Sequence, residues 1–168
     1  MTAIHLGTLE LIRNRRSIRT YTELSVDRDV IELIVDAARM APTAMNNQPW
    51  EFLILTEREL LKGIPPVLGH AEFIANAAFC VLVLGKKIDY AVEDCCAATE
   101  NLILAAEALG LGSCWVAGTG QAYSATLCKT FGVPQDMQLI NIVAVGYPAE
   151  SPTIEKRPLE EMIHWNHF

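Results

Sequence analysis

The longest predicted helix, over residues 89–109, is the strongest constraint on the fold of this chain. Residues 102–106 read Leu-Ile-Leu-Ala-Ala, so the second half of the helix is apolar on nearly every side. A helix on the surface of a globular protein keeps one polar face, whereas a helix that is apolar all round is buried. Gly110 follows at the position where a left-handed residue commonly ends a helix. The sequence therefore predicts a long helix that is buried on most sides.

Shorter segments are expected to pack around that helix. Residues 79–84 form a continuous apolar run of the kind found in buried strands. Because the predicted strands and helices do not alternate strictly, we expect the α+β class, in a single domain over residues 1–168. The other predicted strands cover residues 52–55, 113–117 and 139–145, and the other predicted helices cover residues 5–14, 26–40 (with Ser25 as N-cap), 57–63 and 122–131, with a loop at Pro65, Pro66 and Gly69 and a helical turn at 71–76.

Charge and cysteine usage argue against several classes of protein. The formal net charge is −7 and the pI is near 5.0, whereas a nucleic-acid-binding protein needs a basic surface. The longest apolar run, residues 77–85, is far shorter than the ~20 residues of a membrane-spanning helix. The amino terminus has no secretory signal pattern. Five cysteines, with Cys95 and Cys96 adjacent and no Cys-x-x-Cys pair, predict reduced thiols and a cytoplasmic location.

The apolar share of the chain is high for its length. Hydrophobic residues make up 51% and charged residues 20% of the sequence. A lone compact domain has a large surface to cover with polar groups, so part of the apolar surface is expected to face another subunit. We therefore expect an oligomer, most simply a two-fold homodimer. Asp94 and Asn101, seven positions apart on the long helix, are interpreted as polar positions at that interface, and a shared face near a ligand pocket is the alternative.

Three arginines lie within residues 15–19, which read Arg-Arg-Ser-Ile-Arg and are named the arginine segment. Like charges at this spacing repel one another unless an anion lies among them or water screens them. A phosphate monoester meets this requirement, because guanidinium groups bind phosphate oxygens in pairs and Ser17 adds a hydroxyl donor. From charge alone, a solvated helix end is an equally good interpretation.

Four segments, taken in order, resemble the FMN-dependent nitroreductase family. They are the arginine segment, Ala-Pro-Thr-Ala-x-Asn-x-Gln-Pro-Trp at residues 41–50, Gly-Leu-Gly-Ser-Cys-Trp-Val-Ala-Gly at residues 110–118, and the pair Lys156-Arg157. The resemblance extends over about residues 11–165. It implies a central, mostly antiparallel sheet flanked by helices, with the long helix near the interface of an intertwined homodimer.

The resemblance assigns candidate FMN contacts to both ends of the chain. In the arginine segment, the first arginine and the serine correspond to the phosphate side, the last arginine to the N1/O2 edge of the flavin, and the middle arginine to the phosphate or ribityl chain. The basic pair near the carboxyl end corresponds to tail residues that close over the phosphate, although a solvated tail is the commoner interpretation of such a pair alone. The candidates are Arg15, Arg16, Ser17, Arg19, Lys156 and Arg157.

The two middle segments supply the remaining candidates. Two prolines fix φ within residues 42–50, which predicts a stiff turn whose amide side chains suit the edge of a heterocycle. In the family this loop contributes to the flavin site in part from the partner subunit, while Trp50 is expected to anchor the core. Many relatives have Glu at the position of Ala117, so a contact there to the N5 and O4 side must come from main-chain N–H groups. These candidates are Pro42, Thr43, Ala44, Asn46, Gln48, Trp115, Val116, Ala117 and Gly118.

By resemblance, the expected function is an FMN-dependent NAD(P)H oxidoreductase that reduces nitroaromatic, quinone or activated-alkene acceptors by a ping-pong mechanism, with FMN tightly bound. Two alternatives stay open. One is a non-catalytic flavin-binding redox module. The other is a family offshoot acting in dehalogenation or flavin cleavage, for which residues 56–79 leave little room for a substrate lid. His70 and Phe73 are assigned no role, and no metal site is expected from His164 and His167 in the tail.

Overall fold

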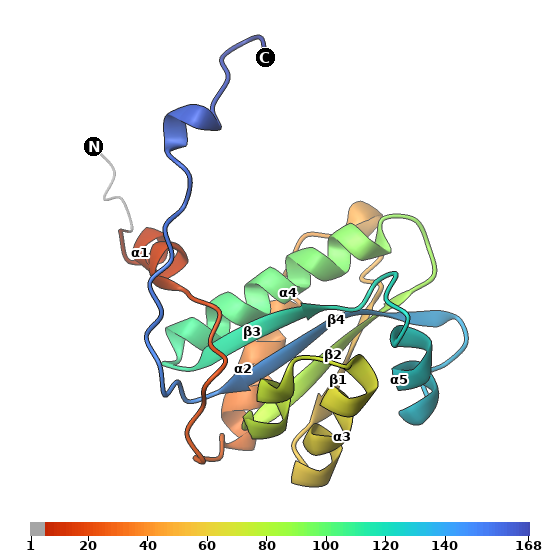
Figure 1. Ribbon diagram of the computed structural model, residues 1–168. Helices are drawn as coiled ribbons and strands as arrows, with labels where there is room; N and C mark the ends of the chain where they lie inside the picture. Colours follow the sequence, from red (N-terminus) through yellow and green to blue (C-terminus); the bar gives the residue numbers. More distant parts are fainter. Residues whose placement is uncertain (1–5) are drawn as a thin grey trace.

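The sheet is the centre of the structure, a computed structural model that describes residues 6–168 (Figure 1). Within these residues the sheet has four strands, each antiparallel to its neighbours, in the order β1-β2-β4-β3. Helices cover both faces without regular β-α-β alternation, which confirms the expected α+β class. The strands are β1 (Trp50–Leu55), β2 (Phe79–Lys86), β3 (Gly112–Ala117) and β4 (Met137–Gly146).

Two helical layers enclose the sheet. In β2, Val81 and Val83 face the helices α2 and α4, whereas Cys80 and Leu82 face α3 and α5. Successive residues of a strand point to opposite faces, so burial on both faces explains the continuous apolar run of this strand. The helices are α1 (Leu6–Asn14), α2 (Arg28–Ala38), α3 (Arg58–Leu68), α4 (Ala91–Ala108) and α5 (Ser124–Thr130), with the short helices η1 (Ala44–Asn46), η2 (Glu72–Asn76) and η3 (Leu159–Glu161).

The long helix is found as α4, one of the two helices that cover the same face of the sheet. Leu102 and Ala106 are fully buried, and Gly110 is left-handed with φ of 76°, as expected at the end of the helix. Leu104 and Ala105 are only half-buried. Part of the apolar surface of α4 is therefore not covered by the rest of the described chain.

Two predicted details of the helices were wrong. The N-cap of α2 is Asp27, not Ser25. α3 continues through Pro65 and Pro66 instead of ending in a loop, because its apolar face is buried and this tertiary packing overrides the two missing N–H donors. Gly69, with φ of 74°, ends the helix by donating its N–H to the carbonyl oxygen of Pro65 over 2.9 Å.

A bulge in β4 determines which side chains lie under the edge strand β3. The register between β2 and β4 shifts between Val83 and Leu84, so that Ile140 and Asn141 both lie on the α4 side of the sheet. A bulge inserts one residue and re-aims its neighbours. The carbonyl oxygen of Ile140 accepts the N–H groups of Gly118 and Thr119 over 2.9 and 3.0 Å, and β3 ends there.

The chain ends approach each other at the edge of β3. Thr22 donates its N–H to the carbonyl oxygen of Tyr147, and Ala149 donates its N–H to that of Thr20, each over 2.9 Å. Beyond this contact the C-terminal tail, residues 151–168, passes α1 and projects away from the sheet (Figure 1). Among the described residues, no helix combines the length and the apolar composition needed to cross a bilayer.

Candidate functional site

The arginine segment lies in extended conformation against the start of β3. The N–H of Ile18 bonds to the carbonyl oxygen of Ser113 over 2.9 Å, and Ile18 itself is buried. This approach requires glycine at position 112, because a Cβ there would lie 2.6 Å from Cγ1 of Ile18. Successive side chains of an extended chain point to opposite sides. The side chains of Arg15, Ser17 and Arg19 are therefore on the side opposite to that of the buried Ile18.

The charges of the outer two arginines act on the same buried thiol, Cys114. Burial raises the pKa of Cys114, while the positive charges of Arg19 and Arg15 act in the opposite direction. Arg16 turns elsewhere: its Nη1 donates to the carbonyl oxygens of Arg13 and Arg15 over 2.6 and 2.9 Å. It lines a different hollow, with Ile18 and residues 148 and 150–152. The Arg16 side chain is therefore directed away from the side of the segment that Arg15 and Arg19 share.

Glu150 holds the backbone of the arginine segment. Its Oε1 accepts the N–H groups of Arg19 and Thr20 over 2.5 and 3.0 Å. The bond from the Arg19 backbone is the main reason that the pKa of this carboxyl lies below its usual range. The sequence contains no signal for this role, because it depends on the approach of two segments 131 positions apart.

Arg19 opens onto a cavity of about 460 Å³. Its guanidinium carbon lies 6.0 Å from the centre of the Phe73 ring. The structure thus joins Arg19 to two candidates from the third segment, Trp115 and Val116. It also adds His70 and Phe73, which had no assigned role. The cavity is lined by Arg19, His70, Ala71, Glu72, Phe73, Cys114, Trp115 and Val116.

The open edge of β3 offers backbone donors beside this cavity. The carbonyl group of Ser113 points away from β4, since it accepts the N–H of Ile18. Outward and inward backbone groups alternate along an antiparallel strand, so those of Trp115 and Ala117 also point outward. The hydroxyl of Tyr123 donates to the Ala117 carbonyl. In the described part of the chain, no hydrogen bond engages the N–H of Trp115 or of Ala117.

A buried polar chain fixes β3 from the opposite face. Trp115 donates its Nε1–H to Oδ1 of Asn141 over 2.8 Å, and the Asn141 amide donates to Oγ1 of Thr99 over 2.9 Å. Thr99 donates in turn to the carbonyl oxygen of Cys95 over 2.7 Å. Asn141 is 4% exposed and was missed from the sequence. Its polar side chain within an apolar strand was the available signal.

Gly118 completes this end of the strand. A Cβ at this position would lie 2.8 Å from the Ile140 carbonyl oxygen and 2.8 Å from Cγ of Leu139. Any larger residue would push the chain away from the bulge that receives its N–H. The end of β3 is therefore held by Asn141, by the bulge at Ile140 and by the hydroxyl of Tyr123, while the outer N–H groups of the strand stay open.

The loop of residues 42–50 lies elsewhere in the protomer, against α4. Asp94, which is 6% exposed, accepts the hydroxyl of Thr43 over 2.7 Å and the N–H of Ala44 over 3.0 Å. Asn46 and Gln48 are exposed, with one bond between the Gln48 side chain and the Asn46 carbonyl oxygen over 3.3 Å. None of the residues of this loop lines the cavity at Arg19.

The sequence matches the Nitroreductase family over residues 12–71 and 65–147. The chain belongs to this family. A protein of Archaeoglobus fulgidus, named as a proposed NADH dehydrogenase/NAD(P)H nitroreductase, is 35% identical over 149 residues, which are 84% of this chain and 86% of that protein.

Solved structures confirm the nitroreductase fold. A proposed NADH dehydrogenase/NAD(P)H nitroreductase from Bacteroides thetaiotaomicron is 30% identical and superimposes with a TM-score of 0.91 over 96% of this chain and 98% of that chain. An FMN-dependent nitroreductase from Clostridium difficile is 26% identical, with a TM-score of 0.90 over 95% and 99% of the two chains. The expected family and fold are thereby both established.

The remaining candidates of this nitroreductase-family chain are more isolated. Lys156 and Arg157 are exposed on the tail, and within residues 6–168 no hydrogen bond or ion pair joins them to the arginine segment. Pro42 is exposed at the start of its loop, and Trp50 is buried, as expected of a core anchor. A single chain therefore leaves the candidates in four separate places, which are the Arg19 cavity, the hollow at Arg16, the loop of residues 42–50 and the tail.

The cysteines and histidines form no further centre in the described part of the chain. All five cysteines are free thiols. Burial, followed by the nearby Cys96 and Asp94, raises the pKa of Cys95 to about 12, so this thiol is a poor nucleophile at neutral pH. Within residues 6–168, no group of three His, Cys, Asp or Glu side chains is arranged to hold a metal ion.

Proposed function

We propose that this protein is an FMN-dependent oxidoreductase that uses NAD(P)H to reduce nitroaromatic, quinone or activated-alkene acceptors in a ping-pong sequence. The names of its relatives support the cofactor and the donor, among them the FMN-dependent nitroreductase of Clostridium difficile and an oxygen-insensitive NADPH nitroreductase of Salmonella typhimurium. The observation that carries the proposal is the cavity that Arg19 and Trp115 both line, beside the edge of β3 whose outer backbone amides are open.

The lining of that cavity, together with neighbouring residues of the arginine segment and of the end of β3 that do not line it, fits the chemistry of FMN. Arg15 and Ser17 offer charged and hydroxyl donors suited to a phosphate. Arg19 supplies positive charge for the N1/O2 edge, where charge accumulates when a flavin is reduced. The N–H groups of Trp115 and Ala117 suit the N5 and O4 side, with Val116 and Gly118 completing the strand end. A volume of about 460 Å³ lies in the usual range of cofactor and ligand pockets.

When bound, FMN supplies the electron-transfer chemistry, and the protein residues bind, orient and tune. No side-chain acid or base is needed for that division of labour, and we assign no catalytic residue. Arg19 lies beside the Phe73 ring, so the cavity combines a cation with an apolar wall that suits a planar aromatic ring. An opening bounded by so few specific polar groups favours broad tolerance of acceptors.

We propose a two-fold homodimer in which the cofactor site is shared. The loop of residues 42–50 is held stiffly on α4 and presents Asn46 and Gln48 outward, yet it does not reach the Arg19 cavity of its own chain. In an isologous dimer each loop would face the cavity of the partner, and each tail would carry Lys156 and Arg157 across the interface. The half-buried apolar residues of α4 support this arrangement. Cytoplasmic location stays a prediction, supported by the free thiols.

Anaerobic reduction tests the proposal directly. The purified protein should retain a yellow chromophore that matches FMN, and NADH or NADPH should bleach it within the time of one turnover. A protein that stays yellow would favour a non-catalytic flavin module or another donor, and a colourless protein that rejects FMN would exclude both. The dehalogenase and flavin-cleavage alternatives are less favoured, since α3 and η2 occupy most of residues 56–79.

Arg15→Ala tests the phosphate assignment. Losing one charge-assisted pair should weaken FMN binding by about 1.5–3 kcal/mol, or roughly 10- to 150-fold, measured by flavin fluorescence during titration. Arg28→Ala is the matched control, because it removes the same charge from an exposed side chain on α2. Equal FMN affinity in both variants would contradict the assignment of Arg15.

A further inference from the structure

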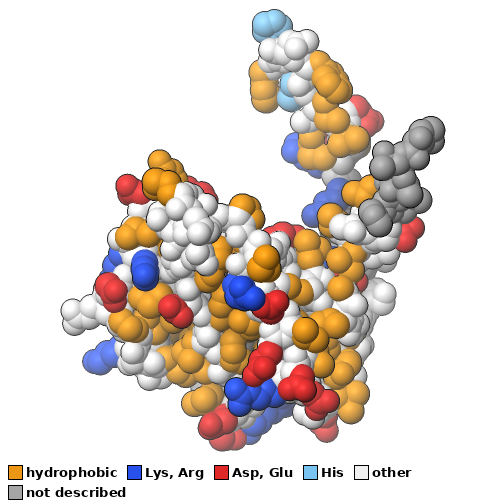
Figure 2. All heavy atoms as spheres, turned by 180° about the vertical axis from the view of Figure 1, so that it is seen from behind, with side chains coloured by type: hydrophobic (Ala, Val, Ile, Leu, Met, Phe, Trp, Pro, Cys, Tyr) orange, Lys and Arg blue, Asp and Glu red, His pale blue; other side chains and the backbone are white. Residues whose placement is uncertain are grey.

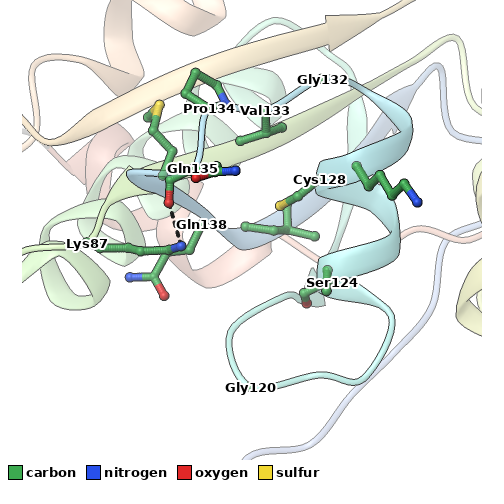
Figure 3. A pocket seen from close by; sticks show the side chains of 13 residues that line it. Lys87, Gly120, Ser124, Cys128, Gly132, Val133, Pro134, Gln135 and Gln138 are labelled. Atoms are coloured by element: carbon green, nitrogen blue, oxygen red, sulfur yellow. Dashed lines mark hydrogen bonds between the residues drawn. The ribbon is translucent and has the colours of Figure 1, made fainter.

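A second cavity, of about 600 Å³, lies beside α5 at the start of β4 (Figure 3). Lys87 and Gln138 stand on one side of it, and Ser124 and Cys128 of α5 stand on the other. The loop of residues 132–135 forms a third wall. Pockets that bind small molecules have volumes of this order. Neither the family resemblance nor the proposed FMN site involves this cavity.

The charge of this cavity is opposite to that of the chain. The whole protein has 20 acidic and 13 basic residues, yet two lysines and no carboxylate are among the lining residues. Among the described residues, neither Lys87 nor Lys129 forms an ion pair. The rest of the lining is neutral, with an apolar part made by Ala125, Cys128, Val133, Pro134, Met137 and Leu139.

Hydrogen bonds within the protein join the walls of the cavity before any ligand binds. Nζ of Lys87 donates to the carbonyl oxygen of Gln135 over 2.6 Å, and the backbone N–H of Lys87 donates to the carbonyl oxygen of Asp136 over 2.9 Å. Val133 donates its N–H to the carbonyl oxygen of Cys128 over 2.9 Å, which links the loop to α5. Two protons of the Lys87 ammonium remain for another acceptor. A ligand would therefore meet a formed site and lose little binding free energy to ordering it.

We propose that this cavity binds a small carboxylate with an apolar or aromatic body. The carboxylate would accept a hydrogen bond from the Lys87 ammonium group, with Lys129 adding positive charge to the lining, and the body would lie on the apolar floor near Met137 and Leu139. This occupant satisfies both halves of the lining, whereas a neutral apolar molecule would supply no negative charge to the lysines and a bare inorganic anion would leave the floor empty.

The site is separate from the Arg19 cavity but is connected to it through α5. Tyr123, at the start of this helix, contacts the His70 ring with centroids 5.7 Å apart and donates to the carbonyl oxygen of Ala117. Ser124, the next residue, lines the second cavity and donates to the carbonyl oxygen of Gly118. A ligand in the second cavity would thus touch a residue bonded to the end of β3. Binding itself does not depend on the proposed cofactor.

Benzoate and benzamide are suitable probes, because they share a shape and differ in charge. Amide signals of the full-length ¹⁵N-labelled protein would be followed by NMR, with and without added FMN. Benzoate should shift the signals of Gly120, Gly132 and Gln138 in a saturable way, and benzamide should bind several-fold more weakly. Raising NaCl from 0.1 to 1 M shortens the Debye length from about 10 to 3 Å. The added salt should therefore weaken the binding of benzoate more than the binding of benzamide.

Three variants separate charge from shape. The affinity for benzoate should fall about five-fold in Lys87→Gln and in Lys129→Gln, which is the scale of an exposed ion pair. It should not change in Lys62→Gln, a substitution on α3. Ala125→Phe should fill the cavity and abolish binding of both probes without changing the charge. The dispersion of the amide signals shows whether each variant is folded. The proposal is overturned if benzoate gives no saturable shift, binds all variants equally, or shifts only residues around Arg19.

Discussion

Three residues of the loop 42–50 are left-handed although none is glycine. Met45, Asn46 and Gln48 have φ of 52°, 57° and 46°. Each such residue costs on the order of 1 kcal/mol unless its side chain relieves the strain. The bonds from Thr43 and Ala44 to Asp94 hold one end of this loop, and strain of this kind persists only where the surroundings determine it. A buried carboxylate therefore controls the shape of a loop that carries five candidate FMN contacts, Asn46 and Gln48 among them.

Asp94→Asn tests this control. The amide group of Asn would face two donors with one acceptor oxygen, so the free energy of unfolding should fall by about 1–3 kcal/mol. FMN affinity should fall as well, because the loop would lose its fixed shape. Denaturant titration and FMN titration measure the two effects, with Glu100→Gln, an exposed carboxylate on the same helix, as control. Unchanged FMN affinity in a destabilised variant would mean that the loop does not contact the cofactor.

Arg19→Ala tests the electrostatic role of the cavity. A cation near the N1/O2 edge stabilises a reduced flavin more than an oxidised one, so its removal should lower the potential of bound FMN. An effect of about 1.5 kcal/mol corresponds to roughly 30 mV for a two-electron couple. Redox titration against a reference dye measures this shift, and Arg28→Ala should leave it unchanged. An unchanged potential in Arg19→Ala would place this side chain away from the ring.

At the scale of elements, β3 is an edge strand that is covered over part of its length. Edge strands expose unpaired backbone groups, which proteins usually cover or block. Here the arginine segment covers the start of the edge at Ser113, and the outer amides of Trp115 and Ala117 stay open. The covered part depends on Glu150, since its carboxylate holds the backbone of the segment from the tail side. The open part is the place where a planar ligand could take up the remaining hydrogen bonds.

In Glu150→Gln, the stability of the fold should depend less on pH than it does in the wild type. A carboxyl pKa that is lower in the folded than in the unfolded state stabilises the fold above the unfolded value of about 4.3, and this stabilisation is lost as pH falls through the folded value. The wild type should therefore be more stable than Glu150→Gln at pH 7, and the difference should narrow below about pH 4. Denaturation midpoints measured between pH 7 and 3 check this. Glu155→Gln, on the same tail without a described hydrogen bond, is the control, and a gap that widens in acid would contradict the assignment.

The elements that could be predicted from sequence are those whose signal is local. The buried run of β2, the long helix and the glycine after it all follow from patterns within one segment, and so do the arginines and the strand over 113–117. The helix through Pro65 and Pro66 could not be predicted, because burial against the sheet outweighs the local breaker. The bulge at Ile140 and the roles of Asn141 and Glu150 depend on contacts between distant segments. The hydrophobic periodicity of a single segment does not reveal contacts between distant segments.

At the scale of the whole molecule, apolar side chains remain uncovered in one protomer. Figure 2 shows hydrophobic side chains over the tail that projects from the body. Trp165 is 82% exposed, and Leu159, Met162 and Ile163 are exposed on the same tail. A tail whose apolar side chains are exposed to water is unfavourable unless a partner covers it. The same tail carries Lys156 and Arg157, so covering it would also fix two of the proposed phosphate contacts.

Removing residues 154–168 tests assembly and cofactor binding together. The full-length chain should sediment at twice the protomer mass of 18.5 kDa. The shortened chain should dissociate with a constant at least roughly 30-fold higher, which corresponds to the loss of one anchor residue of about 2 kcal/mol. Its FMN affinity should fall too, because both the partner loop and the basic pair would be displaced. Sedimentation velocity over a dilution series measures the dissociation constant.

Two point variants show which part of the tail is responsible. Trp165→Ala should weaken the dimer because it removes a large aromatic side chain, whereas Glu161→Ala should not, because a polar side chain at the rim of an interface contributes little. Lys156→Ala combined with Arg157→Ala should reduce FMN affinity and leave the dimer intact. A full-length chain that stays monomeric at micromolar concentration while it retains FMN would contradict the shared site, since one protomer would then bind the cofactor without the loop and tail of another.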